Sequence, residues 1–181
     1  MTSIATVGHS NHPIEKFLEI LSAHRVERVL DVRRFPASRK WPHFNADSLG
    51  RGLLAAGIDY VGVPELGGRR KPNPDSPHVA WRVDAFRGYA DFMDTPEFAS
   101  GLERLFGLAQ ERRSALMCAE ALPWRCHRSL IADALLARGW EVREIVGGNV
   151  RPRRLTPFAR VEGTRVVYDG GELPFANRAE T

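Results

Sequence analysis

The stretch ALMCAEALPWRCHRSLIADALLARG, residues 115–139, contains the signals that decide the fold. Its first four residues form a short apolar run, which is typical of a buried strand. After a turn through Glu120 and Pro123, apolar residues recur with a helical period at Leu130, Ile131, Ala134 and Leu135. Gly139 stands where a helix C-cap is expected. The stretch therefore predicts a strand followed by a helix, and polar residues crowd the junction where open α/β sheets bind their ligands.

Four further apolar runs predict strands at residues 4–7, 26–32, 58–63 and 140–146. Helical patterns lie between them, at residues 13–21, at 45–57 and at 86–110, where Pro96 either kinks one helix or separates two. We therefore expect a three-layer, Rossmann-like α/β fold with a mostly parallel sheet of about five strands. Residues 1–150 are expected to form a single domain. Residues 151–181 are expected to form a C-terminal extension packed on it, partly loose, with a small hairpin at 161–168.

Length and composition are consistent with one well-packed core, since the chain has 181 residues and 43% of them are hydrophobic. No apolar run approaches the ~18 residues that cross a bilayer. The N-terminus lacks the layout of a signal peptide. Two cysteines eight positions apart do not resemble a secreted disulfide framework. We expect a bacterial-type cytoplasmic protein with no membrane partner.

The formal net charge is +4, and only Lys16, Lys40 and Lys71 among the 26 basic residues are lysines. An arginine bias of the whole genome is one explanation. A preference for anionic ligands is the other, because guanidinium groups hold phosphate and carboxylate in a bidentate fork. Net charge does not separate the two explanations.

Right-handed crossovers between parallel strands would bring Gly8, Asp31, Pro64 and Cys118 to one edge of the sheet. Gly8 opens the turn Gly8-His9-Ser10-Asn11, in which Ser10 or Asn11 can cap the next helix. The backbone amides of such a turn can receive an anion. His9 could equally be a structural hydrogen-bonding residue or a ligand contact.

Asp31 lies near the end of the second strand, where a buried carboxylate is costly unless it is paired. It could form a clamp with Arg33 that shapes the loop, or it could act as a base or ligand anchor. The loop that follows interleaves arginines with aromatic residues, at Arg33, Arg34, Phe35, Arg39, Lys40, Trp41 and Phe44. That pattern suits nucleic acid, and it also suits a loop folded over its own sheet.

A second basic loop follows the third strand, with Gly67-Gly68 before Arg69-Arg70-Lys71. Its spacing is not that of a phosphate-binding P-loop. Two basic loops after two strand ends nevertheless favour an anionic ligand. Residues 72–83, which contain three prolines, form an irregular segment that could serve as a lid.

The chain resembles the domain-of-unknown-function family 488 in motifs spread over most of its length. The matching pieces are TVGHSN (6–11), DVR (31–33), LGG (66–68), RGYADFM (87–93), TPEF (95–98), CAEALPWRCHRSLIADAL (118–135) and RLTPFARVEG (154–163). The resemblance makes Cys118, Glu120, Cys126, His127 and Arg128 motif positions. It implies little about activity, since the family is named for lacking a known function.

A cysteine enzyme is one chemistry that the central stretch permits. Cys126 precedes a helix and is flanked by arginines, and both the helix dipole and a nearby cation favour a thiolate. His127 would point about 100° away from Cys126 within a helix, which makes it a poor proton partner. Cys118 is either a buried apolar residue or a partner thiol, with Glu120 on the same side of the strand.

Two other uses of these residues remain open. Cys118, Glu120, Cys126 and His127 could supply zinc ligands, but their spacing is unusual and helical neighbours do not easily converge on one ion. Zinc is therefore only a minor possibility, and no metal or cofactor is predicted. A binding module without catalysis would need only cations around glycine turns. Alternatively, both cysteines belong to the core and Glu120 pairs with Arg125 or Arg128.

We expect an enzyme that acts on a phosphorylated or nucleotide-like substrate, with Cys118 or Cys126 as the reactive thiol. The candidate catalytic residues are Asp31, Cys118, Glu120, Cys126 and His127. The candidate anion-binding residues are Gly8, His9, Ser10, Asn11, Arg33, Arg69, Arg125 and Arg128. The alternative is a nucleic-acid-associated or anion-binding protein that uses the loops at 35–44 and 69–71.

Overall fold

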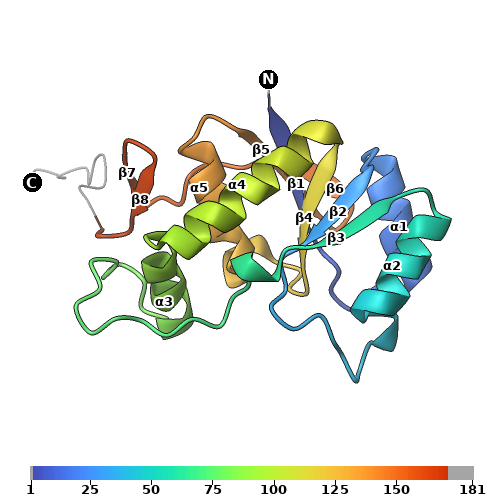
Figure 1. The fold of residues 1–181 in the computed structure, drawn as a ribbon, viewed down its shortest axis with the longest axis horizontal. Coiled ribbons are helices and arrows are strands. Elements are labelled where there is room, and N and C mark those ends of the chain that lie inside the picture. The colour runs from blue at the N-terminus through green and yellow to red at the C-terminus, as the bar shows by residue number, and fades with distance from the viewer. Residues whose placement is uncertain (1, 171–181) are drawn as a thin grey trace, which may run out of the picture.

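In the computed structural model, which describes residues 2–170, a six-stranded sheet forms the middle layer of an α/β fold (Figure 1). Its strand order is β3-β2-β4-β1-β5-β6. The first five strands in chain order are parallel, and β6 runs antiparallel to β5. The strands are β1 (Ser3–Gly8), β2 (Arg28–Asp31), β3 (Asp59–Gly62), β4 (Ser114–Cys118), β5 (Glu141–Val146) and β6 (Asn149–Pro152). The predicted fold class is confirmed, with one more strand than expected.

Helices cover both faces of this sheet, as Figure 1 shows. The helices are α1 (Ile14–Ala23) and α2 (Ala46–Ala55) on one face, and α3 (Asp84–Met93), α4 (Pro96–Glu111) and α5 (Arg128–Leu136) on the other. Successive side chains of a strand point to opposite faces of the sheet, and this alternation produces two hydrophobic cores. Val29 and Met117 pack toward α1 and α2, whereas Leu30 and Leu116 pack toward α4 and α5. Short 3₁₀ turns, η1 (Pro42–Phe44), η2 (Pro64–Leu66) and η3 (Pro123–Arg125), complete the connections.

Two helix starts test the capping predictions. The expected side-chain cap of α1 at Ser10 or Asn11 is wrong: Pro13 is the N-cap and no side chain caps the helix. Ser10 instead takes a left-handed backbone conformation (φ 51°) that turns the chain before the helix begins. The segment at 86–110 is two helices, and Thr95 caps the second by accepting a hydrogen bond from the amide of Phe98 at 3.3 Å.

The segment after β6 packs on the α5 side of the sheet and contains a hairpin of β7 (Arg160–Glu162) and β8 (Arg165–Val167). Its anchor is the buried carboxylate of Asp133, which accepts hydrogen bonds from the hydroxyls of Thr156 (2.6 Å) and Tyr168 (3.0 Å). The expectation of a loose end falls on residues 171–181, which lie outside the described residues. Within residues 2–170, no helix is both long enough and apolar enough to cross a bilayer.

The register of the sheet brings the strand ends together. Gly8 pairs with Cys118 across β1 and β4, and Asp31 pairs with Met117 across β2 and β4. The loops that follow these strands therefore converge at one edge of the sheet, where parallel α/β folds place their sites.

Candidate functional site

A cavity of about 860 Å³ opens at this edge, a volume within the range of small-molecule sites. Its walls come from the segments after β1, β2, β3 and β4 and from the start of α3. Four arginine side chains line it, from Arg33, Arg34, Arg69 and Arg125, against one carboxylate, that of Glu120. The cavity is therefore electropositive, and it suits an anionic ligand.

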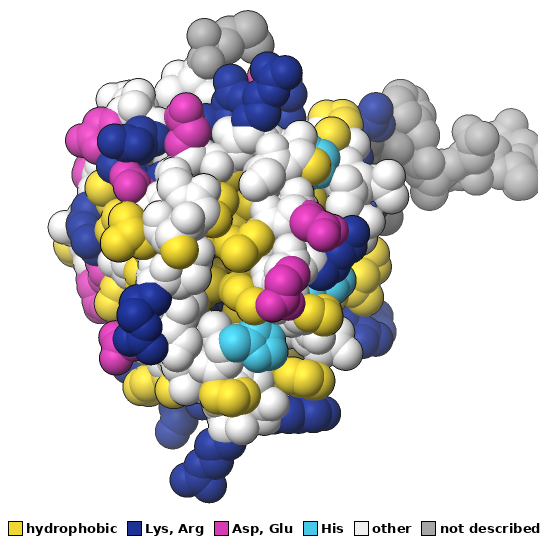
Figure 2. Space-filling model, turned by 90° about the vertical axis from the view of Figure 1, so that its right-hand side faces the viewer, with side chains coloured by type: hydrophobic (Ala, Val, Ile, Leu, Met, Phe, Trp, Pro, Cys, Tyr) yellow, Lys and Arg dark blue, Asp and Glu magenta, His cyan; other side chains and the backbone are white. Residues whose placement is uncertain are grey.

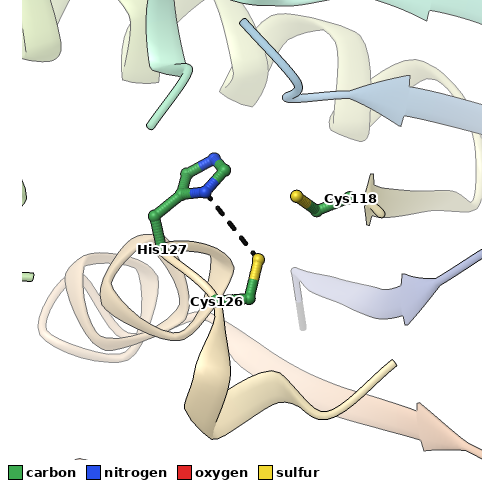
Figure 3. Close-up of side chains that lie close together, drawn as sticks. All are labelled: Cys118, Cys126 and His127. Carbon is green, nitrogen blue, oxygen red and sulfur yellow. Dashed lines mark hydrogen bonds between the residues drawn. The ribbon is translucent and has the colours of Figure 1, made fainter. Parts of the chain in front are cut away.

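Figure 3 shows that the side chains of Cys118, Cys126 and His127 point toward one another, and all three residues line the cavity. Both sulfurs and a ring nitrogen of His127 lie within 4.8 Å of one another. Cys118 stands at the end of β4, whereas Cys126 and His127 stand just before α5. The sequence motif thus folds back on itself, and its two ends form one cluster.

The expectation that His127 points away from Cys126 is wrong, because neither residue lies within the helix. Cys126 is extended (φ −135°, ψ 142°), and α5 begins only at Arg128. The Nδ1 atom of His127 therefore lies 3.7 Å from the Cys126 sulfur, and the amide of Arg128 points at the same sulfur from 3.5 Å.

The protonation pattern of His127 follows from its other nitrogen. Nε2 lies 3.0 Å from the carbonyl oxygen of Val32, which can only accept, so Nε2 carries the proton of the neutral ring. Nδ1 then presents its lone pair to the thiols. The ring packs against Tyr89 and against Gly68, where a Cβ would come within 2.9 Å of Nδ1. Gly68 is glycine because the imidazole occupies the space of a side chain.

Arg128 does not line the cavity; it is buried beneath it, with 1% of its surface exposed. Its guanidinium donates to the carbonyl oxygens of Val7 (2.6 Å), Glu120 (3.1 Å) and Ala121 (3.5 Å). These bonds tie the loop after β4 to β1. The predicted role of Arg128 as a ligand contact does not fit this position. An ion pair between Arg128 and the Glu120 carboxylate is not formed either, since the guanidinium contacts the backbone carbonyl of Glu120.

Gly8 also supports the loop rather than lining the cavity. A Cβ at this position would come within 2.0 Å of the carbonyl oxygen of Glu120. The carboxylate of Glu120 accepts a hydrogen bond from the amide of Leu122 at 3.3 Å and lines the cavity wall. The loop after β4 therefore needs glycine at the end of β1.

The two thiols have opposite shifts in pKa. The pKa of Cys118 is held well below its usual range by a hydrogen bond from the Cys126 thiol. The protonated form of His127, which carries a second proton on Nδ1, and the positive charge of Arg128 add to the effect. The pKa of Cys126 is raised because it donates to Cys118 and is buried. We assign the negative charge of the pair to Cys118, because the Cys126 thiol donates to it and the positive charge of Arg128 lies near it.

Asp31 forms the clamp that was one of its two predicted roles. Its carboxylate accepts hydrogen bonds from the amide and Nε of Arg33 (3.0 and 2.9 Å), from the Arg33 Nη2 (2.6 Å) and from the Tyr60 hydroxyl (2.7 Å). Burial beside this carboxylate raises the pKa of Tyr60. Asp31 is buried and does not line the cavity. It orients Arg33, which does.

Both ring nitrogens of His9 are occupied by protein groups. Nδ1 lies 2.9 Å from the carbonyl oxygen of Ser10, and Nε2 lies 3.1 Å from the Arg33 guanidinium, which can only donate. The neutral ring therefore donates from Nδ1 and accepts at Nε2. Burial, together with the charge of Arg33, lowers the pKa of His9 to about 4. His9 lines the cavity as a rigid neutral wall that stacks on Phe44.

The structure thus separates the predicted residues into two groups. Those that line the cavity are His9, Ser10, Asn11, Arg33, Arg69, Cys118, Glu120, Arg125, Cys126 and His127. Gly8, Asp31 and Arg128 support them from below. Tyr60 and the role of Gly68 were not predicted from the sequence. The glycine pair in the loop after β3 was a usable signal, but nothing near Tyr60 pointed to Asp31.

The cluster could also hold a cation, since Cys118, Cys126 and His127 offer three donors that can reach one ion. The objection from helical spacing no longer applies, because Cys126 and His127 precede the helix. A hydrogen bond from the other ring nitrogen to a carbonyl is common in histidine ligands. The same geometry serves a thiolate equally well.

Comparisons with known proteins add a family and nothing more specific. A family model described as "Domain of unknown function DUF488" matches residues 13–135, from the start of α1 to α5, including both cysteines and His127. No curated protein and no solved structure matches the chain. The matched region covers well over half of the sequence, and the chain therefore belongs to the DUF488 family.

Proposed function

We propose that this protein is an enzyme that uses the Cys118 thiolate as a nucleophile on a phosphorylated or nucleotide-like substrate bound in the arginine-lined cavity. The observation that carries this proposal is the unbalanced charge of Arg128. Within residues 2–170, no carboxylate forms an ion pair with this buried guanidinium, and the atoms that accept its hydrogen bonds are neutral carbonyl oxygens.

A lone charge buried in protein is costly unless an opposite charge lies nearby. The Cys118 thiolate supplies that charge, and it accounts for a single negative charge in the cluster. A divalent cation bound by two thiolates would leave the positive charge of Arg128 unbalanced. Charge balance therefore favours one thiolate and one thiol over a metal site.

Cys118 is the better nucleophile of the two cysteines. Cys126 keeps its proton and donates a hydrogen bond to Cys118, whereas Cys118 carries the charge at the end of β4 and lines the cavity. A thiolate at such a position can attack an electrophilic atom of a bound ligand.

The reaction that fits the cluster has two steps. The sulfur of Cys118 forms a bond to the electrophilic centre, and the leaving group departs with its electron pair. Water then attacks the covalent intermediate and gives a proton to Nδ1 of His127, and the thiolate leaves with the electrons of the sulfur bond. A neutral histidine with a free Nδ1 suits this second step.

The charge on the substrate is inferred from the cavity arginines. Arg34, Arg69 and Arg125 are exposed and have no carboxylate ion-pair partner among the described residues, unlike Arg33. Unpaired guanidinium groups in a cavity are suited to phosphate oxygens.

The proposal is tested by alkylating the reduced protein at neutral pH with iodoacetamide and reading each cysteine by peptide mass. Cys118 should react first, and inorganic pyrophosphate should slow its modification. Arg69→Gln and Arg125→Gln should weaken this protection, whereas Arg51→Gln, an exposed arginine on α2, should not. Faster reaction at Cys126, inert cysteines, or no effect of pyrophosphate would overturn the proposal.

A further inference from the structure

Three aromatic side chains lie in the cavity lining or next to a lining residue in the chain, and each is paired with a basic group. Phe35 is 61% exposed, and the guanidinium groups of Arg34 and Arg69 lie 5.6 and 5.7 Å from its ring centre. Trp124 is 51% exposed, next to Arg125 in the chain, with Arg151 5.5 Å from its ring. We call Phe35, Trp41 and Trp124 the mouth aromatics.

Trp41 forms the third pair, with the ammonium group of Lys40 at 5.3 Å from its ring. Phe35 and Trp41 lie in the loop after β2, and Trp124 lies in η3 before the motif cysteine. Phe35 and Trp124 are exposed, whereas Trp41 is partly buried and packs against the core beside α1 and α2. Each of the three rings has a basic group close to its face.

We propose that this mouth binds single-stranded nucleic acid, with bases stacked on the mouth aromatics and one nucleotide inside the cavity. An exposed ring beside a guanidinium group matches a base beside its phosphate, which is how single strands are held without sequence preference. The inference rests on the proposed function, because it names the substrate class for the same cavity.

The distribution of charge supports this partner. Most arginines away from the site are paired with carboxylates, whereas the Asp31–Arg33 pair is the one ion pair within residues 2–170 that involves a cavity-lining residue. Figure 2 shows basic side chains protruding at the lower edge of the molecule, where Figure 1 places the loop after β2. The charges of Arg34, Arg69 and Arg125 are therefore available to a polyanion, whereas Arg151 beside Trp124 is ion-paired with Glu144.

A polymer fits the mouth better than a free nucleotide. Trp124 and Arg151 do not line the cavity, so a ligand confined to the cavity would not use them. A strand long enough to extend beyond the cavity lining could reach Trp124 and Arg151. Aromatic rings with basic partners lie both in the cavity lining and outside it, which is consistent with a strand that stacks several successive bases on them.

The test is fluorescence anisotropy of the intact protein with a labelled oligothymidylate of about twelve nucleotides, a length that spans such sites. The single strand should bind more tightly than a duplex of equal length, and thymidine monophosphate should compete only weakly. Phe35→Ala and Trp124→Ala should each weaken binding about tenfold, the loss expected for one stacked base. Leu54→Ala, which truncates a 71% exposed residue on α2, should leave binding unchanged.

Each result separates the two proposals. Binding of the oligonucleotide by a protein whose Cys118 does not react with iodoacetamide would contradict the catalytic proposal alone. Three results would overturn the nucleic-acid inference. The duplex and the single strand could bind equally tightly, or Phe35→Ala and Trp124→Ala could bind as tightly as Leu54→Ala. The third result is complete displacement of the oligonucleotide by the mononucleotide. A reactive Cys118 in a protein that binds no oligonucleotide would leave the catalytic proposal standing and remove this one.

Discussion

The Nε2 atom of His127 donates a hydrogen bond to the carbonyl oxygen of Val32 over 3.0 Å, across 95 positions of the chain. This single bond decides which ring nitrogen faces the thiols, because the protonated nitrogen must point at the carbonyl. It also connects the loop after β2, with its basic and aromatic residues, to the start of α5. The reactive cluster and the cavity mouth are therefore held by the same contact.

Gly68→Ala should disturb this arrangement without unfolding the protein. The new Cβ would come 2.9 Å from Nδ1 of His127, so the ring must move away from the thiols. Since His127 helps to lower the pKa of Cys118, we expect that pKa to rise and alkylation at neutral pH to slow. Gly107→Ala on α4, where a Cβ would meet nothing within 4 Å, should change neither. Equal alkylation rates in the two variants would contradict this role of His127.

Cys126→Ala and Cys126→Ser should differ in their effect on Cys118. Alanine removes the hydrogen-bond donor, whereas the serine hydroxyl can still donate to the thiolate. The pKa of Cys118, measured from thiolate absorbance against pH, should rise more in the alanine variant, by about one unit or more if the bond stabilises the charge by ~1.4 kcal/mol. Identical titrations of the two variants would exclude Cys126 as the donor.

The Cys118 thiolate should make the free energy of unfolding depend on pH. Its pKa is lowered in the folded state, so unfolding takes up a proton below the usual thiol pKa of ~8.5. Stability should therefore rise with pH up to about that value, by at most ~1.4 kcal/mol per pH unit relative to Cys118→Ala. Above the usual thiol pKa, stability should fall as the pH rises, because the raised pKa of Cys126 keeps this thiol protonated in the folded state while it ionises in the unfolded state. Urea denaturation at several pH values measures this, and parallel curves for the two proteins would contradict it.

His9 should account for part of the loss of stability in acid. Its folded pKa of about 4 lies below the unfolded value of 6.5, so the unfolded state binds the extra proton in between. Stability should fall as pH falls from about 6.5 toward 4, with a slope of at most ~1.4 kcal/mol per unit from this residue. His9→Gln should flatten that decline in denaturation experiments. An unchanged decline in the variant would show that His9 is not the group responsible.

Arg69→Gly should separate backbone strain from ligand binding. Arg69 has a left-handed backbone (φ 62°), which glycine adopts freely, so the change should alter the unfolding free energy by no more than ~1 kcal/mol. Affinity for pyrophosphate and for the oligonucleotide should fall. Arg25→Gly is the matched control, since Arg25 (φ 54°) is also exposed but lies outside the cavity. Equal affinity in the two variants would contradict the role of Arg69.

The sequence was sufficient for the architecture but not for the details of the edge. Apolar runs and helical periods predicted five strands and the helices between them, because burial on both faces leaves an unmistakable pattern. The strand β6 was not predicted, because it is exposed throughout and lacks an apolar pattern. It ends in Pro152, a residue that only an edge strand of a sheet tolerates. The N-cap of α1 was misplaced because Ser10 was needed for a turn.

The motif residues were predictable, whereas their geometry was not. The orientation of His127 depends on the carbonyl of Val32, a backbone atom just after β2 that is distant in sequence and that no local pattern reveals. The burial of Arg128 depends likewise on carbonyls brought in by β1. Arg128 therefore looked like a ligand contact in sequence and became a buried counter-charge in the fold.

The most direct test of this account is the pH profile of alkylation at Cys118 and at Cys126, read separately by peptide mass in reduced protein whose metal content is measured on the same sample. We predict that Cys118 stays reactive well below the ~8.5 of a free thiol, that Cys126 does not, and that the protein holds no stoichiometric metal. Two inert cysteines in metal-free protein, a lowered profile at Cys126 instead, or one bound metal ion per chain would contradict the thiolate at Cys118.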